Sequence, residues 1–439
     1  MLAMWSRRLF VGAAAALAAG PVHAAKTGSD KPAVLGGKPV RTESFPSWPL
    51  VEKNDEKLLL ETLRSRLWNR RNGRNTESFE KAWATKIGAG HAVATNGGTT
   101  ALYAGLAALD IGPKDEVIVP PYTFIATVNA VLQHHALPVF VDTDFQTHQI
   151  DPSKIEAAIT KNTRVILPVH IAGSAADMDA ILAIGKKHGI PVLEDACQAH
   201  LGEWRGRKLG TLGAAGCFSF QASKNLNCGE GGCLVTNDRD LAVRASAFQN
   251  NGNPLHGDGK NRGYGSNLRM TEFQASVLHA QMERLDEQAA RRSANAAYLD
   301  GLLADVAGVT PARRYEGCTR SAYHLYMLRY EPEAFGGMSK ARFMEAVKAE
   351  GIPLSGGYHP LNHDDFLEKA FQTRAFRAVY SSGEMAKWRE RNVTPVNDRL
   401  CGEAFWFGQT TLLGERSDME QIAEAFHKIH RFAGEIGRG

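Results

Sequence analysis

The sequence predicts an α/β protein with a mostly parallel sheet flanked by helices, followed by a smaller C-terminal α+β domain. Between residues 90 and 236, short apolar runs alternate with stretches of helical length, which is the pattern of βαβ units. The run over residues 117–119 is apolar throughout, as in strands that are covered on both faces. At 439 residues the chain is long enough for two domains and a large core.

The elements of the larger domain are expected in a regular order. A proline-marked arm over residues 25–50 leads into helices at 53–71 and 76–88. Strands are expected at 90–94, 116–121, 138–142, 164–169, 191–195 and 217–220, with a further strand ending at Thr236. Helices at 101–109, 126–134, 152–159 and 175–188 connect them, and a long helix runs from residue 272 to about 297.

The domain boundaries follow from this pattern. We assign residues 1–24 to a signal peptide, 25–75 to an N-terminal arm and helix, 76–297 to the large domain and 298–439 to the small domain. In the small domain, residues 323–330 alternate like a strand, and the loop 354–360 is expected to carry His359 toward the cleft.

Two segments of the large domain indicate chemistry. Lys224 lies in a polar turn between two buried strands, beside the glycine-rich loop 229–232. A lysine in a surface turn is the commoner case, but a desolvated lysine has a lowered pKa and can form a Schiff base with a carbonyl. Asp195 ends the strand 191–195, where ligands bind in open α/β sheets. A strand-end aspartate and a pocket lysine suit pyridoxal phosphate (PLP), which needs a carboxylate at its ring nitrogen and an amine at its aldehyde.

A third segment is suited to binding phosphate. Residues 96–100 form a turn of small residues that opens a helix, where free N–H groups and the helix dipole favour an anion. The alternative is a helix N-terminus without a ligand. Residues alone leave both interpretations open.

With residues 120–127, these segments closely resemble the DegT/StrS family of fold-type-I PLP-dependent aminotransferases, which act on sugars and cyclitols. The resemblance extends from about residue 35 to the C-terminus, and Thr100 replaces the usual serine of the phosphate turn. It implies that Lys224 forms the Schiff base and that Asp195 pairs with the ring nitrogen. The other implied cofactor contacts are Gly98, Thr99 and Ser219 on the phosphate, Phe124 stacked on the ring (Tyr122 being the weaker candidate), Gln198 on the phenolic oxygen, and Asn267 reaching the phosphate of a neighbouring subunit.

The resemblance implies transfer of an amino group from glutamate or glutamine to a keto-sugar or keto-cyclitol, in a homodimer with shared active sites. One alternative is a PLP-dependent sugar dehydratase or deoxygenase, but those relatives carry histidine in place of the lysine. The other is a non-catalytic exported relative that binds sugars or regulates. The sequence leaves the acceptor, the donor and the regiochemistry open, because these depend on pocket loops.

Composition and the N-terminus bear on partners and compartment. The formal net charge of +4 argues against nucleic acid as a partner, and the six cysteines form neither a disulfide framework nor the paired spacing of a zinc site, so no metal is expected. Residues 6–11 match a twin-arginine export signal, followed by a weakly apolar stretch and a small-residue cleavage site at 22–24. The stretch is too short for a stable membrane span. We therefore expect export to the periplasm (or the cytoplasm if the leader does not function) and an acceptor that is not nucleotide-linked.

Overall fold

The computed structural model describes residues 31–255 and 257–438 and has a central sheet in the larger domain. Four strands pair in the order β1-β9-β8-β5 and three in the order β3-β2-β4, and parallel bridges from β4 to the β5 segment join the two sets. The strands are β1 (His91–Thr95), β2 (Glu116–Val119), β3 (Leu137–Phe140), β4 (Thr163–Ile166), β5 (Leu193–Asp195), β8 (Ala215–Ser219) and β9 (Gly232–Thr236). A two-stranded hairpin, β6 (Glu203–Trp204) and β7 (Arg207–Lys208), lies outside this sheet.

Strand β9 is antiparallel to both its neighbours, and the other pairings of the sheet are parallel. The register places Ser219 opposite Gly232 at the end of β8. The turn with Lys224 therefore starts at the edge where β5 ends with Asp195, since β5 and β8 run in the same direction. The predicted mostly parallel α/β sheet is confirmed.

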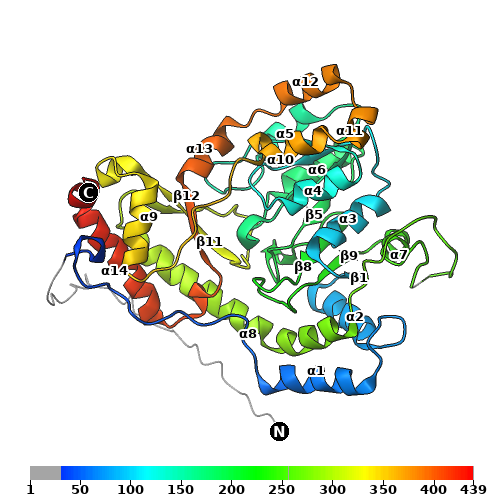
Figure 1. Cartoon of the computed structure of the whole chain (residues 1–439), viewed down its shortest axis with the longest axis horizontal. Helices are drawn as coiled ribbons and strands as arrows, with labels where there is room; N and C mark the ends of the chain where they lie inside the picture. The colour runs from blue at the N-terminus through cyan, green and yellow to red at the C-terminus, as the bar shows by residue number, and fades with distance from the viewer. Residues whose placement is uncertain (1–30, 256, 439) are drawn as a thin grey trace, which may run out of the picture.

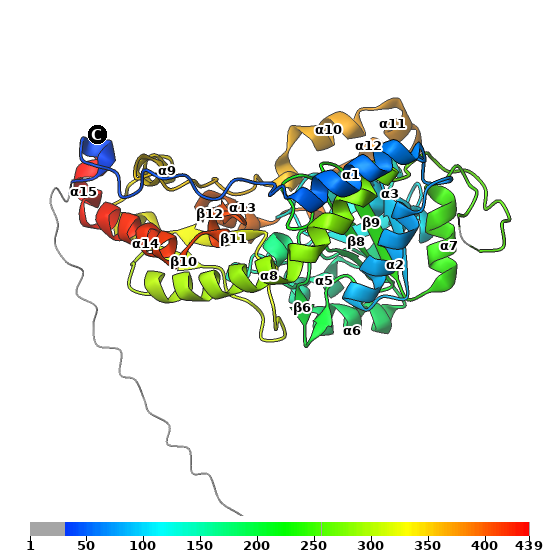
Figure 2. The same cartoon turned by 90° about the horizontal axis from the view of Figure 1, so that it is seen from below.

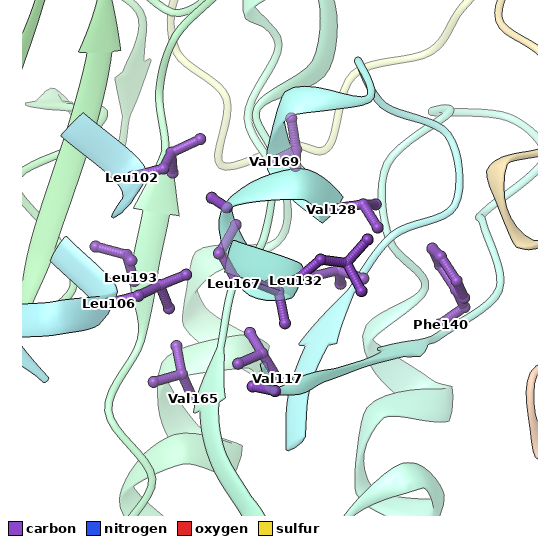
Figure 3. Close-up of a cluster of buried hydrophobic side chains, with 14 of the residues drawn as sticks. Leu102, Leu106, Val117, Val128, Leu132, Phe140, Val165, Leu167, Val169 and Leu193 are labelled. Carbon is purple, nitrogen blue, oxygen red and sulfur yellow. The ribbon is translucent and has the colours of Figure 1, made fainter. Parts of the chain in front are cut away.

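Helices cover both faces of the sheet (Figure 1). The apolar side chains between the helices and the sheet are buried. Figure 3 shows part of this core, in which Leu106 and Leu132 from two helices approach Val117, Val165 and Leu193 from three strands. Each such fully buried side chain contributes about 1.5–3 kcal/mol. The covering helices are α2 (Asn75–Ile87), α3 (Gly98–Ala108), α4 (Ala126–Gln133), α5 (Pro152–Ala158), α6 (Met178–His188) and α7 (Arg239–Phe248), with a short 3-10 turn η2 (Ile171–Gly173).

Two helices differ from the predicted length by six residues. Helix α1 (Lys53–Ser65) ends before residue 71, because Arg66 adopts a left-handed conformation (φ 60°) that stops the helix. Helix α8 (Glu272–Leu303) starts at a capping box between Thr271 and Gln274 and runs beyond residue 297 into the small domain (Figure 2). It packs against α1 and α2 in one domain and α14 in the other.

The small domain is built on an antiparallel sheet with strand order β10-β11-β12. Its core joins the stacked rings of Phe343 and Phe426 to Phe405 of the sheet. The strands are β10 (Val309–Pro311), β11 (Leu325–Tyr330) and β12 (Ala404–Gly408). The associated helices are α9 (Lys340–Ala349), α14 (Arg416–Arg431) and α15 (Ala433–Ile436), with 3-10 turns η3 (Pro332–Phe335) and η5 (Thr411–Leu413).

A helical segment between β11 and β12, residues 361–403, leaves this sheet and packs on the large domain (Figure 1). The Trp388 indole donates to the Pro138 carbonyl at 2.7 Å, and the Asn392 side-chain oxygen accepts from the Phe140 N–H at 2.6 Å. The segment 361–403 comprises η4 (Leu361–His363), α10 (Asp365–Phe371), α11 (Arg374–Val379), α12 (Ser382–Arg391) and α13 (Pro395–Glu403). The predicted boundary at 297/298 stays a prediction, but this part of the small domain is bound to the large one.

The N-terminal arm crosses the small domain and ends at the lysine turn. Its first part includes η1 (Ala33–Leu35) and is held by Glu350, which accepts from the Ala33 and Val40 N–H groups. Farther along, the Trp48 indole donates to the Ala222 carbonyl at 2.9 Å, two residues before Lys224. The predicted leader, residues 1–24, lies outside the described residues. Among those described, no helix is both long enough and apolar enough to cross a membrane.

Candidate active site

One cavity of about 670 Å³ lies at the carboxyl edge of the sheet, between the two domains, and gathers most of the predicted site residues. Its lining includes Gly98, Thr99, Phe124, Asp195, Gln198, Ser219 and Lys224. The predicted Asn267 does not line it. Segments separated by more than a hundred residues therefore meet in one concave site of the size that binds a cofactor with a small substrate.

The turn after β8 positions the Lys224 side chain in this cavity. The Lys224 N–H donates to the Gln221 carbonyl at 2.8 Å, so the backbone turns tightly below the side chain. Burial lowers the pKa of the Lys224 amine, and the nearby Cys197 and Asp195 partly oppose this effect. The amine therefore loses its proton at a lower pH than an exposed lysine does, which favours attack on a carbonyl.

Asp195 is a buried carboxylate that its neighbours hold in place. One of its oxygens accepts from the Thr127 hydroxyl at 2.8 Å and the other from the Cys197 N–H at 3.1 Å. A carboxylate fixed in this way at the end of β5 can accept a hydrogen bond from a protonated ring nitrogen.

The opposite end of the cavity is suited to an anion. Helix α3 begins at Gly98 after an extended Gly97, and no side chain caps it, so its first N–H groups are left for a ligand. A Cβ atom on Gly98 would lie 2.5 Å from Cβ and 2.9 Å from Oγ of Ser219. The absence of a side chain at Gly98 is thus what brings the Ser219 hydroxyl next to the helix N-terminus.

Phe124 and Tyr122 have different environments, although they are two residues apart. Phe124 lines the cavity and is 58% exposed, which is unusual for a large apolar side chain. Tyr122 is fully buried and does not line the cavity, and burial raises its pKa well above the usual value. Of the two, only Phe124 has a ring surface available for stacking on a ligand.

Gln198 bridges the two domains. Its side-chain oxygen accepts from the Ala172 N–H at 2.6 Å, and its amide nitrogen donates to the Tyr358 hydroxyl at 2.9 Å. Burial raises the pKa of Tyr358 to about 12, so this hydroxyl stays protonated. The second amide hydrogen of Gln198 remains for a ligand oxygen.

The small domain supplies three cavity residues that sequence reasoning missed: His324, Tyr358 and Trp406. The prediction that His359 approaches the cleft is wrong, because His359 is exposed and its neighbour Tyr358 lines the cavity instead. The loop 354–360 lies beside the cavity as predicted, but the side chain that enters the cavity is that of Tyr358. His324 directly precedes β11, and the sequence pattern indicated a strand there rather than a site.

Asn267 is exposed on this chain, and its backbone pairs with Asn250. It follows a segment that projects from the body of the large domain after α7 (Figure 1). The described structure therefore gives Asn267 no contact with its own cavity, and its predicted role toward a neighbouring subunit stays a prediction.

The residues present fit PLP. An amine of lowered pKa, a buried carboxylate, an uncapped helix N-terminus beside a serine, and an exposed aromatic ring surround a single cavity. These groups match the aldehyde, the ring nitrogen, the phosphate and the ring face of the cofactor in turn. The individual roles assigned from the sequence stay predictions.

Comparison with known proteins identifies what this arrangement resembles. The model of the DegT/DnrJ/EryC1/StrS aminotransferase family matches residues 49–394. An L-glutamine:2-deoxy-scyllo-inosose aminotransferase of Streptoalloteichus tenebrarius is 36% identical over 92% of this chain and 98% of its own length. The enzyme of that name from Micromonospora echinospora is 36% identical over 90% and 97%. Among solved structures, 3-amino-5-hydroxybenzoic acid synthase superposes with a TM-score of 0.79 at 32% identity, covering 90% of this chain and 99% of that one.

Proposed function

Since the chain belongs to the DegT/DnrJ/EryC1/StrS aminotransferase family, we propose that it transfers the amino group of L-glutamine to a ring ketone of a cyclitol. It is a PLP-dependent aminotransferase. The observation that carries the proposal is the convergence of Lys224, Asp195 and the uncapped start of α3 on one cavity, in a chain that matches glutamine:cyclitol aminotransferases over nearly their full length.

The position of each residue in the cavity suggests its role. Bound PLP supplies a carbonyl that exchanges amino groups and a ring that withdraws electrons. Lys224 would hold the cofactor through its amine, and the same amine in its neutral form could take a proton from the donor's α-carbon. Asp195, oriented by Thr127, would accept a hydrogen bond from the ring nitrogen and favour its protonated form. Tyr358 and Trp406 contribute to the wall of the cavity from the small domain.

The lysine also separates this proposal from the alternatives. Sugar dehydratases and deoxygenases of the family carry histidine at the position of Lys224, and a non-catalytic relative would not need an amine of lowered pKa in its cavity. The acceptor is proposed to be a free ring ketone because the predicted export signal would take the enzyme away from nucleotide-linked sugars. That part of the proposal depends on residues outside the described structure.

A spectroscopic half-reaction tests the proposal. The visible absorbance of the purified enzyme is recorded before and after addition of L-glutamine, for the wild type, for Lys224→Ala and for the exposed-lysine control Lys387→Ala. We expect loss of the absorbance of the lysine-bound cofactor in the wild type and the control, and no such absorbance in Lys224→Ala. Adding 2-deoxy-scyllo-inosose should restore it in the wild type. Unchanged absorbance with both L-glutamine and L-glutamate would refute amino transfer.

We also propose that the enzyme is a homodimer with shared sites. Helix α1 and the residues after it present a large apolar surface to solvent, formed by Leu59, Leu60, Leu63, Leu67 and Trp68, which are each 39–49% exposed. Several exposed apolar side chains within one short segment are typical of an interface. The exposed Asn267, which has no role in its own cavity, supports a site completed by a second copy.

Mixing two inactive variants tests the shared site. Asn267→Ala and Lys224→Ala chains are refolded together or co-expressed, and activity is compared with that of each variant alone. A hybrid dimer has one site with both Lys224 and Asn267, so activity should approach a quarter of the wild-type value for random pairing. Absence of activity in a mixture that contains hybrid dimers would refute the shared site.

A further inference from the structure

His324 lies next to the reactive lysine, although it comes from the other domain. Its Nε2 atom is 3.4 Å from Nζ of Lys224, and its side chain lines the cavity while being only 7% exposed. This is the hydrogen bond that the structure records for the lysine amine within the described residues. A role for this pair depends on Lys224 being the residue that holds the cofactor, as proposed above.

The hydrogen bonds around His324 fix its tautomer. The Asn225 amide nitrogen donates to the Ala322 carbonyl at 2.8 Å, so the Asn225 side-chain oxygen faces Nδ1 of His324 at 3.2 Å. A carbonyl oxygen accepts hydrogen bonds and cannot donate them, so Nδ1 must carry the hydrogen. In a neutral imidazole this leaves Nε2 with its lone pair toward Lys224.

The backbone before His324 is held in an unfavourable conformation. Tyr323 has a φ of 50°, in the left-handed region that a bulky side chain rarely adopts. Ala322, just before it, is anchored twice: its N–H donates to the Gly173 carbonyl at 2.9 Å and its carbonyl accepts from Asn225. Such strain persists where surrounding contacts impose it, and it is common at functional sites. Here it directs the His324 ring into the cavity.

The charged and titratable groups around His324 keep the imidazole neutral. Burial lowers its pKa well below the usual value, and Lys224, His200 and the buried Arg292 of α8 lower it further. The acidic neighbour of Lys224 in the cavity is Asp195, and the Cys197 thiol lies beside it; both favour the charged amine, against the effect of burial. The lysine is therefore held by an uncharged acceptor, which favours the ammonium form less than a carboxylate at the same distance would.

We propose that His324 is a positioning residue for Lys224: its Nε2 accepts a hydrogen bond from the amine and holds it against the small-domain wall, with its lone pair directed into the cavity. Asn225 acts through His324, because it fixes the imidazole tautomer in which Nε2 can accept a hydrogen bond from Lys224. An amine held in this way meets a carbonyl or an α-carbon in one orientation, and misplacement of a reacting group by about 1 Å costs up to about a hundredfold in rate.

The test compares His324→Phe, His324→Gln and a matched control, His148→Phe. Like His324, His148 is buried, but among the described residues its ring nitrogens have no hydrogen-bond partner, and it does not line the cavity. Two properties are measured on the full chain after removal of the cofactor by dialysis with hydroxylamine. One is the rate at which absorbance appears on adding PLP. The other is the pKa of Lys224, from labelling by limiting acetic anhydride between pH 6 and 11, quantified by mass spectrometry.

We expect His324→Phe to capture PLP about ten- to a hundredfold more slowly than the wild type. His324→Gln, which retains an acceptor oxygen, should recover most of the rate, and His148→Phe should match the wild type. The pKa of Lys224 should fall in His324→Phe, because the charged amine loses an acceptor. If PLP is captured more slowly although the Lys224 amine is more often neutral, the loss of rate comes from the orientation of the amine and not from its protonation.

Two outcomes would overturn the proposal. One is a capture rate in His324→Phe within about twofold of the wild type. The other is a Lys224 pKa that stays the same or rises toward the ordinary value of 10.5, because a rise indicates a site loosened to water rather than a lost hydrogen bond. Neither readout uses glutamine or a cyclitol, so a wrong substrate assignment would leave this test unaffected.

Discussion

The contact between Gly98 and Ser219 gives a quantitative prediction for Gly98→Ala. The added Cβ would lie 2.5 Å from Ser219 Cβ, 2.9 Å from its Oγ and 3.1 Å from Sγ of Cys197. Carbon atoms in contact are about 3.5–4.0 Å apart, so the start of α3 and the end of β8 must separate by about 1 Å. Neither side yields easily, because Ser219 is paired within the sheet and residue 98 begins a helix.

Overpacking of this kind costs about 1–3 kcal/mol. Where that cost falls on the phosphate end of the cavity, the Kd for PLP rises about 5- to 140-fold, at about 1.4 kcal/mol per factor of ten. The assay is titration of the cofactor-free enzyme with PLP, followed by visible absorbance, with the free energy of unfolding of the cofactor-free protein measured in parallel.

Gly97→Ala is the matched control. A Cβ on Gly97 would have Thr100 Oγ1 at 3.6 Å as its nearest neighbour, and Gly97 is extended (φ −174°), which any residue can adopt. We expect this variant to bind PLP within about threefold of the wild type. If Gly98→Ala changes neither the affinity for PLP nor the stability of the protein, the reasoning from close approach is wrong.

Three further predictions concern stability and assembly. Burial lowers the pKa values of His148 and His200 to about 3 in the fold, against 6.5 ordinarily, so the unfolded chain binds more protons between these two values. The free energy of unfolding should therefore fall by about 1.4 kcal/mol per pH unit per histidine as the pH drops below 6.5. Denaturant unfolding at pH 7.5 and 5.5 should show this loss, with a smaller difference between the two pH values in His148→Phe; an equal difference in that variant would contradict the prediction. Trp388→Ala should cost about 3–5 kcal/mol of stability in the same assay, because it leaves a cavity and an unpaired Pro138 carbonyl, whereas a loss below about 1 kcal/mol would argue against the packing of α12. Leu63→Glu places a charge on the exposed face of α1 and should yield monomers in analytical ultracentrifugation. A stable dimer of this variant would contradict an interface at α1.

The large domain was predictable because its signals are local. Strands β2, β3 and β4 lie in short segments rich in apolar residues between helical stretches, and each was expected to within about two or three residues. Asp195 could be found because it ends a buried strand, and Lys224 because it lies in the turn after another; β5 and β8 are parallel, so their ends share one edge of the sheet. Their roles came from the family resemblance rather than from spacing.

The small-domain half of the site was not predictable from local pattern. Tyr358 and Trp406 enter the cavity together because the loop after α9 pairs with β12 through Ser355 and Trp406. Both line the same cavity as Lys224, from which they are more than a hundred residues away in the sequence. His324 depends on a positive φ at Tyr323, for which a tyrosine gives no signal. Which of the neighbouring His359 and Tyr358 lines the cavity is likewise decided by packing, since adjacent residues of an extended loop point in different directions.

The attachment of residues 361–403 to the large domain bears on how the enzyme opens. Two bodies joined by one hinge can part and close around a ligand. Here α8 joins the domains, and the segment 361–403 attaches to the large domain at a second place, through Trp388 of α12 and Asn392 just after it. Two such attachments oppose rotation about either one, so we expect substrates to enter and products to leave by movement of side chains and loops at the cavity mouth. Release of the aminated product then depends on the mobility of a few surface residues, and the turnover rate can be tuned there without disturbing the chemistry below.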